Sequence, residues 1–149
     1  MSGGDPRTVE SFDPARFMSY VSRFGHSGAI GITYRDHGPD WCELALPYSE
    51  QLVGMPESGI IASGPIISLM DMATSISIWV RLGRFRPQAT LDLRVDYLRP
   101  ARPGQTVVGR GECYGLKRSI GFVRGQAHDG DPADPIAHVS GTFIVTESF

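Results

Sequence analysis

The spacing of apolar residues changes several times along the chain. Phe17, Tyr20, Val21 and Phe24 recur at helical intervals ahead of Gly25, which predicts a short amphipathic helix that ends at this glycine. Apolar and polar residues then alternate in HSGAIGITYRDHG and again in WCELALPY, and DHGPD between them is typical of a turn. We therefore expect a β-hairpin to follow the helix, with a loop over residues 49–58 after it.

The most apolar part of the chain, residues 58–80, contains one ionisable side chain, Asp71. Gly64 and Pro65 indicate a helix start, because proline fits the first turn of a helix, where its missing amide is not needed. We expect a long helix from there to about Leu82, and the apolar residues on nearly every side of it predict that other structure surrounds it. A carboxylate in such a helix is costly unless it is paired, so Asp71 is the first candidate functional residue.

Period-two alternation returns in the second half of the chain. Four stretches, ATLDLRVDYLRP, QTVVGRGECYG, IGFVRGQAHD and IAHVSGTFIVTE, are typical of strands and are connected by short turns rich in Gly, Pro and Asp. The order of elements therefore predicts an α+β domain in which a curled, mostly antiparallel sheet wraps around the long central helix.

Composition and charge limit what this domain can bind. The 149 residues suit a single domain, 1–149, of which residues 1–12 are expected to be a loose lead-in. A net charge of −2 offers no attraction for nucleic acid or an anionic membrane. The N-terminus has neither the basic start nor the apolar stretch of a secretory signal, so we expect a cytoplasmic protein.

Several other chemistries have little support in the sequence. Cys42 and Cys113 are too few for a disulfide framework or a Cys-x-x-Cys metal site, and the four histidines fall in separate segments, so we expect reduced thiols and no metal. The apolar segment is long enough to cross a membrane, but Asp71 and the surrounding hydroxyl residues make insertion costly. The G-x-S-x-G motif of α/β serine hydrolases is absent.

Four motifs in combination resemble one known family. They are the helix GPIISLMDMATSISIW with its central aspartate, the strand TLDLRVDYLRPARPG, the turn LKRSIGF and the closing strand IAHVSGTFIV. In this order they resemble the hotdog-fold thioesterases of the phenylacetyl-CoA thioesterase (PaaI-like) branch, relatives of 4-hydroxybenzoyl-CoA thioesterase. The resemblance spans about residues 28–145. It implies the hotdog fold, an acyl-CoA substrate, and no cofactor apart from the coenzyme A that the substrate carries.

The resemblance also implies roles for individual residues. Asp71 matches an aspartate that acts as general base for water or as nucleophile, and Thr90 matches a hydroxyl residue that helps to hold the water. Ser63 or Gly64 matches the position whose backbone amide polarises the thioester carbonyl. The chemistry is coherent, since free amides at a helix start stabilise an oxyanion. The alternatives are a structural carboxylate bonded to neighbouring Ser or Thr residues, and a threonine present for its β propensity.

One departure from the family pattern bears on catalysis. Relatives carry His-Gly-Gly before the helix, and Ala62, Ser63 and Gly64 stand in its place here, so the histidine is absent. An asparagine or glutamine of many relatives aligns with Pro56, and Glu57 is the nearby residue that could substitute for it. Catalysis would then be slow or lost, which leaves open a second interpretation, a non-catalytic acyl-CoA-binding protein.

Coenzyme A carries phosphates, so cations are expected near the mouth of the cleft. Lys117 and Arg118 in the predicted turn rank first, and the other candidates are Arg84, Arg86 and Arg99. The expected function is hydrolysis of the thioester of a small, medium or aromatic acyl-CoA. A hotdog dehydratase is disfavoured, because the Asp/His pair of that branch is not found.

The resemblance implies a homo-oligomer, either a dimer or a tetramer, whose sheets join edge to edge. Helix geometry points the same way, because Gly64 and Asp71 lie roughly 10 Å apart along one helix at about 1.5 Å per residue. One small carbonyl group cannot reach both. We therefore expect each site to combine residues of two chains.

Overall fold

The computed structural model describes residues 11–147. Two short helices, α1 (Pro14–Val21) and α2 (Gly25–Ile30), precede a hairpin of β1 (Thr33–His37) and β2 (Trp41–Leu46). The remaining elements are a 3₁₀ turn (Glu50–Leu52), β3 (Val53–Met55), β4 (Ile60–Ile61), α3 (Ser63–Leu82), β5 (Gln88–Tyr97), β6 (Val107–Lys117), β7 (Ile120–His128) and β8 (Ala137–Val145).

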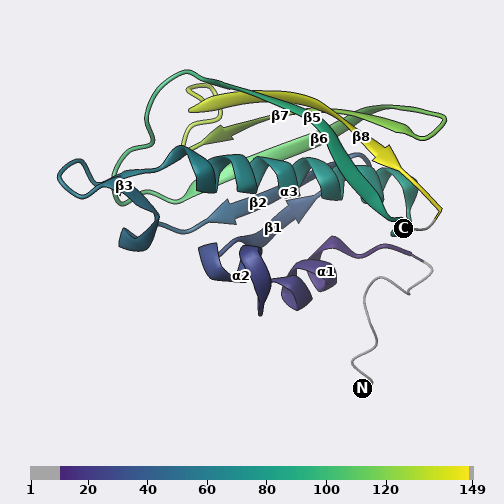
Figure 1. Ribbon diagram of the computed structural model, residues 1–149, viewed down its shortest axis with the longest axis horizontal. Coiled ribbons are helices and arrows are strands. Elements are labelled where there is room, and N and C mark those ends of the chain that lie inside the picture. Colours follow the sequence, from purple (N-terminus) through teal and green to yellow (C-terminus); the bar gives the residue numbers. More distant parts are fainter. Residues whose placement is uncertain (1–10, 148–149) are drawn as a thin grey trace.

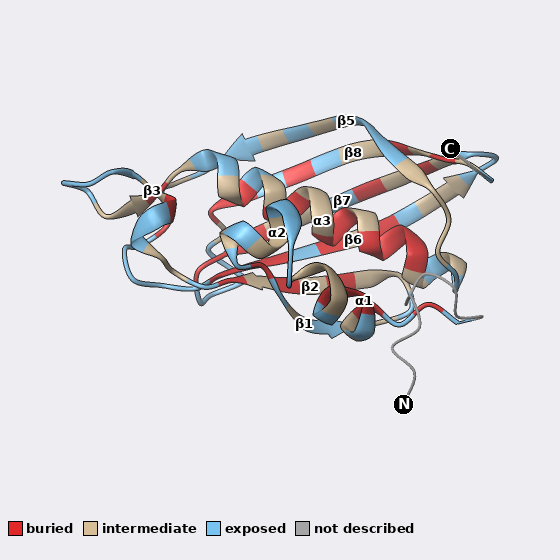
Figure 2. Cartoon of the chain, turned by 60° about the horizontal axis from the view of Figure 1, so that its bottom comes forward, coloured by how far each residue is buried: buried red, intermediate tan, exposed pale blue. Residues whose placement is uncertain are grey.

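Six strands form one antiparallel sheet in the order β1-β2-β6-β7-β8-β5, and α3 lies along its inner face (Figure 1). The predicted α+β class, with a curled antiparallel sheet around a long central helix, is confirmed. Strands β1 and β5 are the two edges of the sheet. Figure 2 shows β5 in the colours of exposed and half-buried residues, and none of its residues is buried, whereas the central strands are buried where they face the helix.

Glycines of β6 allow α3 to pack directly on the sheet. A Cβ atom at Gly111 would come within 2.6 Å of the backbone of Ala73, and one at Gly109 within 2.8 Å of the sulfur of Met70. The glycines of GRGECYG therefore serve close packing of helix and sheet. By length and composition α3 could cross a membrane, but it is the core helix, and residues such as Leu69 and Ile76 are completely buried in the core.

Two local predictions are wrong. The first helix ends at Val21, four residues before Gly25, and residues 26–30, expected at the start of a strand, belong to α2. Gly25 and Gly31 have positive φ angles of 69° and 85°, so the chain can turn into and out of one short helical segment that an alternating pattern does not reveal. The expected loop at residues 49–58 contains the 3₁₀ turn and β3, which are too short to show a periodic pattern.

The N-terminal lead-in is only partly within the described residues. Residues 1–10 lie outside them. Phe12, which was expected to belong to the lead-in, is buried, with its ring 5.5 Å from those of Phe17 and Trp79. Its amide also donates a hydrogen bond to the carbonyl of Gly83 at 3.0 Å, so this residue is part of the packed domain.

Candidate active site

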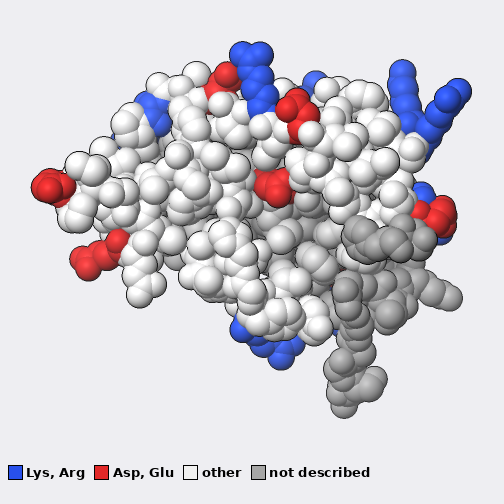
Figure 3. Space-filling model, viewed as in Figure 1, with Lys and Arg blue, Asp and Glu red and all other residues white. Residues whose placement is uncertain are grey.

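One face of α3 is open in this chain. Gly64 and Ile67 are exposed, and Ser68, Asp71 and Ser75 are half-buried; residues at this spacing share a face of a helix. Asp71 is the only acidic residue of α3, and acidic and basic side chains are scattered thinly over this face of the molecule (Figure 3). The sheet packs against α3 as predicted, and the half-buried Asp71 lies on the face of the helix that this chain leaves open.

Within the part of the chain that the structure describes, the carboxylate of Asp71 is held by a single hydroxyl. Thr90 Oγ1 donates a hydrogen bond to Asp71 Oδ1 at 2.8 Å. The hydroxyls of Thr74 and Ser75 bond the backbone carbonyl of Asp71, at 3.2 and 2.7 Å, so these neighbours do not satisfy its carboxylate. No ion pair involves Asp71 within residues 11–147. The carboxylate therefore has acceptor capacity left for a water molecule.

A bulge in β5 brings Thr90 to this position. Strict alternation with the inward-facing Leu93 and Val95 would place Thr90 on the outer face of the sheet. The pairing of β5 with β8 shifts by one residue between Thr90 and Asp92, so that Thr90 also faces α3 and Leu91 is left 56% exposed. The bulge thus aims the hydroxyl at the helix.

Two further hydrogen bonds join β5 to α3, one on each side of the Thr90–Asp71 hydrogen bond. The Tyr97 hydroxyl donates to the carbonyl of Ser63 at 2.9 Å, and burial raises the pKa of this phenol. Gln88 Nε2 donates to the carbonyl of Ser75 at 2.9 Å. No side chain caps the start of α3, so the amides near Gly64 are not engaged by a capping side chain.

A histidine missed in the sequence also reaches the open face of α3. His26 Nε2, from α2, lies 2.8 Å from Ser68 Oγ. Ser68 precedes Asp71 by three residues, and side chains at this spacing are neighbours on one face. Residues 26–30 were predicted to begin a strand, and the sequence gives no sign that His26 belongs to a helix beside α3, so this contact was not expected.

An aromatic cavity of about 320 Å³ lies beyond Ser75, between α1, the C-terminal half of α3 and the start of β5. The rings of Phe17 and Phe85 lie 5.1 and 4.7 Å from that of Trp79. Its lining consists of Phe17, Tyr20, Val21, Phe24, Trp79, Phe85 and Gln88. Gln88 Oε1 is buried and accepts no hydrogen bond from any described residue. This side chain does not stand out in the sequence, although it lies two residues before Thr90 on the same face of β5.

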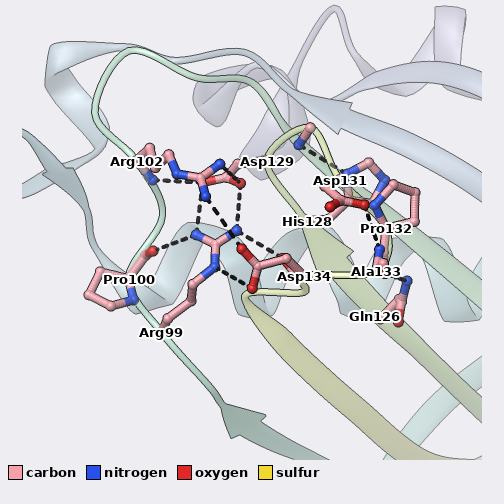
Figure 4. A network of polar contacts seen from close by, with 11 residues as sticks. Arg99, Pro100, Arg102, Gln126, His128, Asp129, Asp131, Pro132, Ala133 and Asp134 are labelled. Atoms are coloured by element: carbon pink, nitrogen blue, oxygen red, sulfur yellow. Dashed lines mark hydrogen bonds and ion pairs between the residues drawn. The ribbon is translucent and has the colours of Figure 1, made fainter.

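One of the candidate phosphate-binding cations is already engaged. Arg99 pairs with Asp129 through two hydrogen bonds of 2.7 and 3.0 Å and with Asp134 at 3.2 Å (Figure 4). The Arg102 amide adds a bond of 2.8 Å to Asp129. The hydrogen bonds from Arg99 hold the pKa of Asp129 well below its usual range. Arg99 therefore ties two loops together, which makes it a weaker phosphate ligand than the sequence suggested.

Of the other candidate cations, Arg84 and Arg86 precede β5, and Lys117 and Arg118 lie at the β6–β7 turn. Arg86 donates to the carbonyl of Thr146 at 3.2 Å and pairs with Glu147 at 2.7 Å, and Arg84 is exposed. Lys117 and Arg118 are exposed at the β6–β7 turn, where Arg118 has a φ of 57°. The strand registers align Lys117 with Ile120, Ile120 with Ile144 and Ile144 with Ala89, so the turn lies at the same end of the sheet as the start of β5. Lys117 and Ala89 are three strand spacings apart, which is roughly 15 Å at the usual spacing.

The sequence matches a known family. The model of the thioesterase superfamily matches residues 58–136, which is more than half of the chain, so this chain belongs to the thioesterase superfamily. A Halobacterium salinarum protein, named as a candidate esterase, is 29% identical over 138 residues, which are 88% of this chain and 91% of that protein.

Solved structures agree with this membership. A Pseudomonas aeruginosa protein is 41% identical, with a TM-score of 0.76 over 87% of this chain and 94% of that one. A thioesterase of Haemophilus influenzae superposes with a TM-score of 0.80 at 20% identity, over 93% of this chain and 94% of that one. The Escherichia coli PaaI protein of the phenylacetic acid degradation operon gives 0.71 at 15% identity, over 82% and 84%. The hotdog fold and the resemblance to PaaI-like thioesterases are thereby confirmed.

Proposed function

We propose that this protein hydrolyses the thioester of an acyl-CoA with a small, medium or aromatic acyl group, in the cytoplasm. The observation that carries the proposal is the Asp71 carboxylate, which lies on the open face of an apolar helix and, among residues 11–147, is held only by Thr90, at 2.8 Å. A buried structural carboxylate would be expected to have its acceptor sites filled. Membership of the thioesterase superfamily supports the same reaction.

The chemistry follows from what these groups can hold. A water molecule that donates to Asp71 and lies beside the Thr90 hydroxyl has one proton directed at a base. As its oxygen attacks the thioester carbon, that proton passes to Asp71, and an amide at the start of α3 stabilises the oxyanion. The carbon–sulfur bond then breaks and coenzyme A leaves as the thiolate. A direct attack by Asp71 would instead form a transient anhydride.

Two chains would share each site. The amide of Gly64 and the carboxylate of Asp71 are roughly 10 Å apart along α3, which is too far for one carbonyl group. Strand β5 is an edge of the sheet and, among residues 11–147, pairs only with β8, so its other side can pair with a second copy. In a two-fold dimer each site then takes its amide from one chain and its base from the other.

Subunit complementation tests this arrangement. An Asp71→Asn chain and a chain blocked by a bulky residue at Gly64 should each be nearly inactive. After subunit exchange, the heterodimer contains one intact site, so activity should return to roughly half of wild type per heterodimer. Exchange that mass measurement demonstrates but that restores no activity would place the whole site within one chain.

A panel of acyl-CoAs tests the reaction itself. The purified protein is mixed with short, long and aromatic acyl-CoAs and a thiol reagent that reports free coenzyme A. We expect release from at least one small, medium or aromatic member. If every member is silent while acyl-CoA still binds, the protein is the non-catalytic binder, which the absence of a histidine before α3 favours.

A further inference from the structure

The hydroxyl of Tyr97 contacts the start of α3, where the candidate oxyanion amide lies. It donates a hydrogen bond of 2.9 Å to the backbone carbonyl of Ser63. This carbonyl is also placed to accept a bond within the helix, and because a carbonyl oxygen has two lone pairs, Tyr97 can occupy the second. Burial raises the pKa of the phenol, so the hydroxyl remains a donor at neutral pH. The bond is therefore an addition to the hydrogen bonds that any helix makes.

The carbonyl that Tyr97 binds and the amide of Gly64 belong to the same peptide unit. The described peptide bonds are all trans, so the C=O and the N–H of this planar unit point in opposite directions. A bond that fixes the direction of the Ser63 carbonyl therefore also fixes the direction of the Gly64 N–H. It polarises this N–H as well, since hydrogen bonds in series strengthen one another by roughly 10–30% each.

The Gly64 N–H is open to a ligand. It lies in the first turn of α3, where amides have no acceptor within the helix, and no side chain among residues 11–147 caps this turn. A Cβ atom at Gly64 would meet no atom of another part of the chain within 4 Å, so the space beside this residue is open. Helix ends fray, so the direction of such an amide has to be fixed by a contact from outside the helix.

We propose that Tyr97 is a positioning residue, whose hydroxyl orients and polarises the Ser63–Gly64 peptide so that the Gly64 N–H points at the carbonyl oxygen of the bound acyl group. The inference rests on the proposed thioesterase function and holds whichever chain supplies the base. Donors that are already oriented stabilise an oxyanion because they need no rearrangement as the charge develops. Strand β5 then orders both halves of the chemistry, since Thr90 holds the Asp71 carboxylate at 2.8 Å and Tyr97 holds the oxyanion peptide.

A matched pair of tyrosine variants tests this role. Tyr97→Phe keeps the ring and removes the hydroxyl, so kcat should fall about three- to tenfold, the equivalent of one hydrogen bond, with KM nearly unchanged. Tyr48→Phe is the control, because the Tyr48 hydroxyl also donates to a backbone carbonyl, that of Gly59 at 2.9 Å, which lies outside α3. Its kcat should stay near wild type. Thermal unfolding verifies that both variants fold, and equal kcat values in the two would overturn the inference.

The Gly64 amide provides a second measurement, one that a purely stabilising hydrogen bond would not change. In NMR spectra of the free protein, the amide proton and nitrogen signals of Gly64 should move upfield in Tyr97→Phe, because a less polarised N–H is more shielded. The signals of Gly83, just beyond the other end of α3, should stay in place. A fluorotyrosine at position 97 keeps the hydroxyl and should keep both the Gly64 signals and kcat near wild type. Identical Gly64 signals in Tyr97→Phe and wild type would overturn the inference.

Binding separates this inference from the proposed reaction. A ketone analogue, in which a methylene group replaces the sulfur of an acyl-CoA, keeps the carbonyl oxygen but cannot be hydrolysed. If its binding moves the Gly64 amide proton downfield, less so in Tyr97→Phe, and no ester is turned over, the inference is supported and the thioesterase is contradicted. Turnover that is equal in Tyr97→Phe and Tyr48→Phe supports the thioesterase and contradicts the inference. Absence of both turnover and any Gly64 shift contradicts both.

Discussion

Two aspartates of this chain illustrate opposite uses of a carboxylate. The side chain of Asp129 is completely buried, and Arg99, Arg102 and a backbone amide fill its acceptor sites. Asp71 is half-buried on a helix face and receives one bond from the neutral hydroxyl of Thr90. Burial alone would single out Asp129 as the more unusual residue.

The difference lies in the acceptor capacity that each carboxylate retains. Two guanidinium groups and an amide leave Asp129 little capacity for a further ligand, and its depressed pKa is the mark of a satisfied anion. Such a group joins the loops that precede β6 and β8 and stabilises them. Asp71 keeps free lone pairs at the surface of the chain, which a base needs in order to bind water. Incomplete satisfaction therefore separates the candidate catalytic residue from the structural one.

The largest expected effect on activity comes from Asp71→Asn. Asparagine keeps the volume and still accepts the Thr90 hydrogen bond but cannot take a proton, so kcat should fall at least about a hundredfold. The melting temperature should change little, because the carboxylate forms no ion pair within the described residues. Hydrolysis assays and thermal unfolding measure the two quantities. Activity within a few fold of wild type would make Asp71 structural.

The same substitution at Asp129 should lower stability and leave activity nearly unchanged, which is the opposite of the result expected at Asp71. Asp129→Asn removes the charge between Arg99 and Arg102, and breaking a buried ion pair of this kind costs about 3 kcal/mol. For a domain of this size that cost corresponds to a decrease in melting temperature of roughly 10 °C. The kcat of the folded fraction should stay near wild type. An unchanged melting temperature would show that the network contributes nothing to stability.

Acid unfolding provides an independent check on Asp129. Its pKa is lower in the folded chain than in the unfolded chain, so its stabilising contribution is present above the unfolded value, about 4, and is lost as the pH falls below it. The Asn variant has no such contribution to lose. The stability difference between wild type and Asp129→Asn should therefore be larger at about pH 7 than at about pH 3 in urea unfolding.

A smaller effect is expected at Thr90, which donates a hydrogen bond to the Asp71 carboxylate and, in the proposed mechanism, helps to hold the water. Thr90→Val keeps the shape of the side chain and removes one hydrogen bond, worth about 1 kcal/mol, so kcat should fall roughly fivefold. KM should change little, and Thr90→Ser should recover most of the loss because it restores the hydroxyl. If valine is as active as threonine, the 2.8 Å hydrogen bond has no part in the reaction.

The strongest periodic patterns of the sequence predicted most of this fold. The long helix ends at Leu82 as expected, since Gly83, with a φ of 74°, stops it. The four strands that follow were recognisable from alternation. Helix α2 was not, because two glycines with positive φ allow a short helix inside what resembles an alternating strand.

The candidate site was predictable only in part. Asp71 is conspicuous in an apolar helix, but its partner is 19 residues away, and only family resemblance suggested Thr90. Alternation alone places Thr90 on the wrong face, because the bulge after it is not encoded in the apolar pattern. The contact of His26 with Ser68 and the unpaired oxygen of Gln88 depend on tertiary structure, which no local pattern reports.

The candidate phosphate-binding cations also differ in whether other residues already bind them. Substituting the available ones is expected to have the smallest effect on activity. Arg99 is held by two aspartates, whereas Lys117 and Arg118 project from an exposed turn. If these two hold the phosphates of coenzyme A, replacing both with alanine should raise KM about three- to tenfold and weaken its dependence on salt. The kcat should hardly change, because such contacts are equal in ground and transition states. Arg94→Ala, on the outer face of β5, serves as the control, and an unchanged KM in the double variant would move the phosphate site to Arg84 or Arg86.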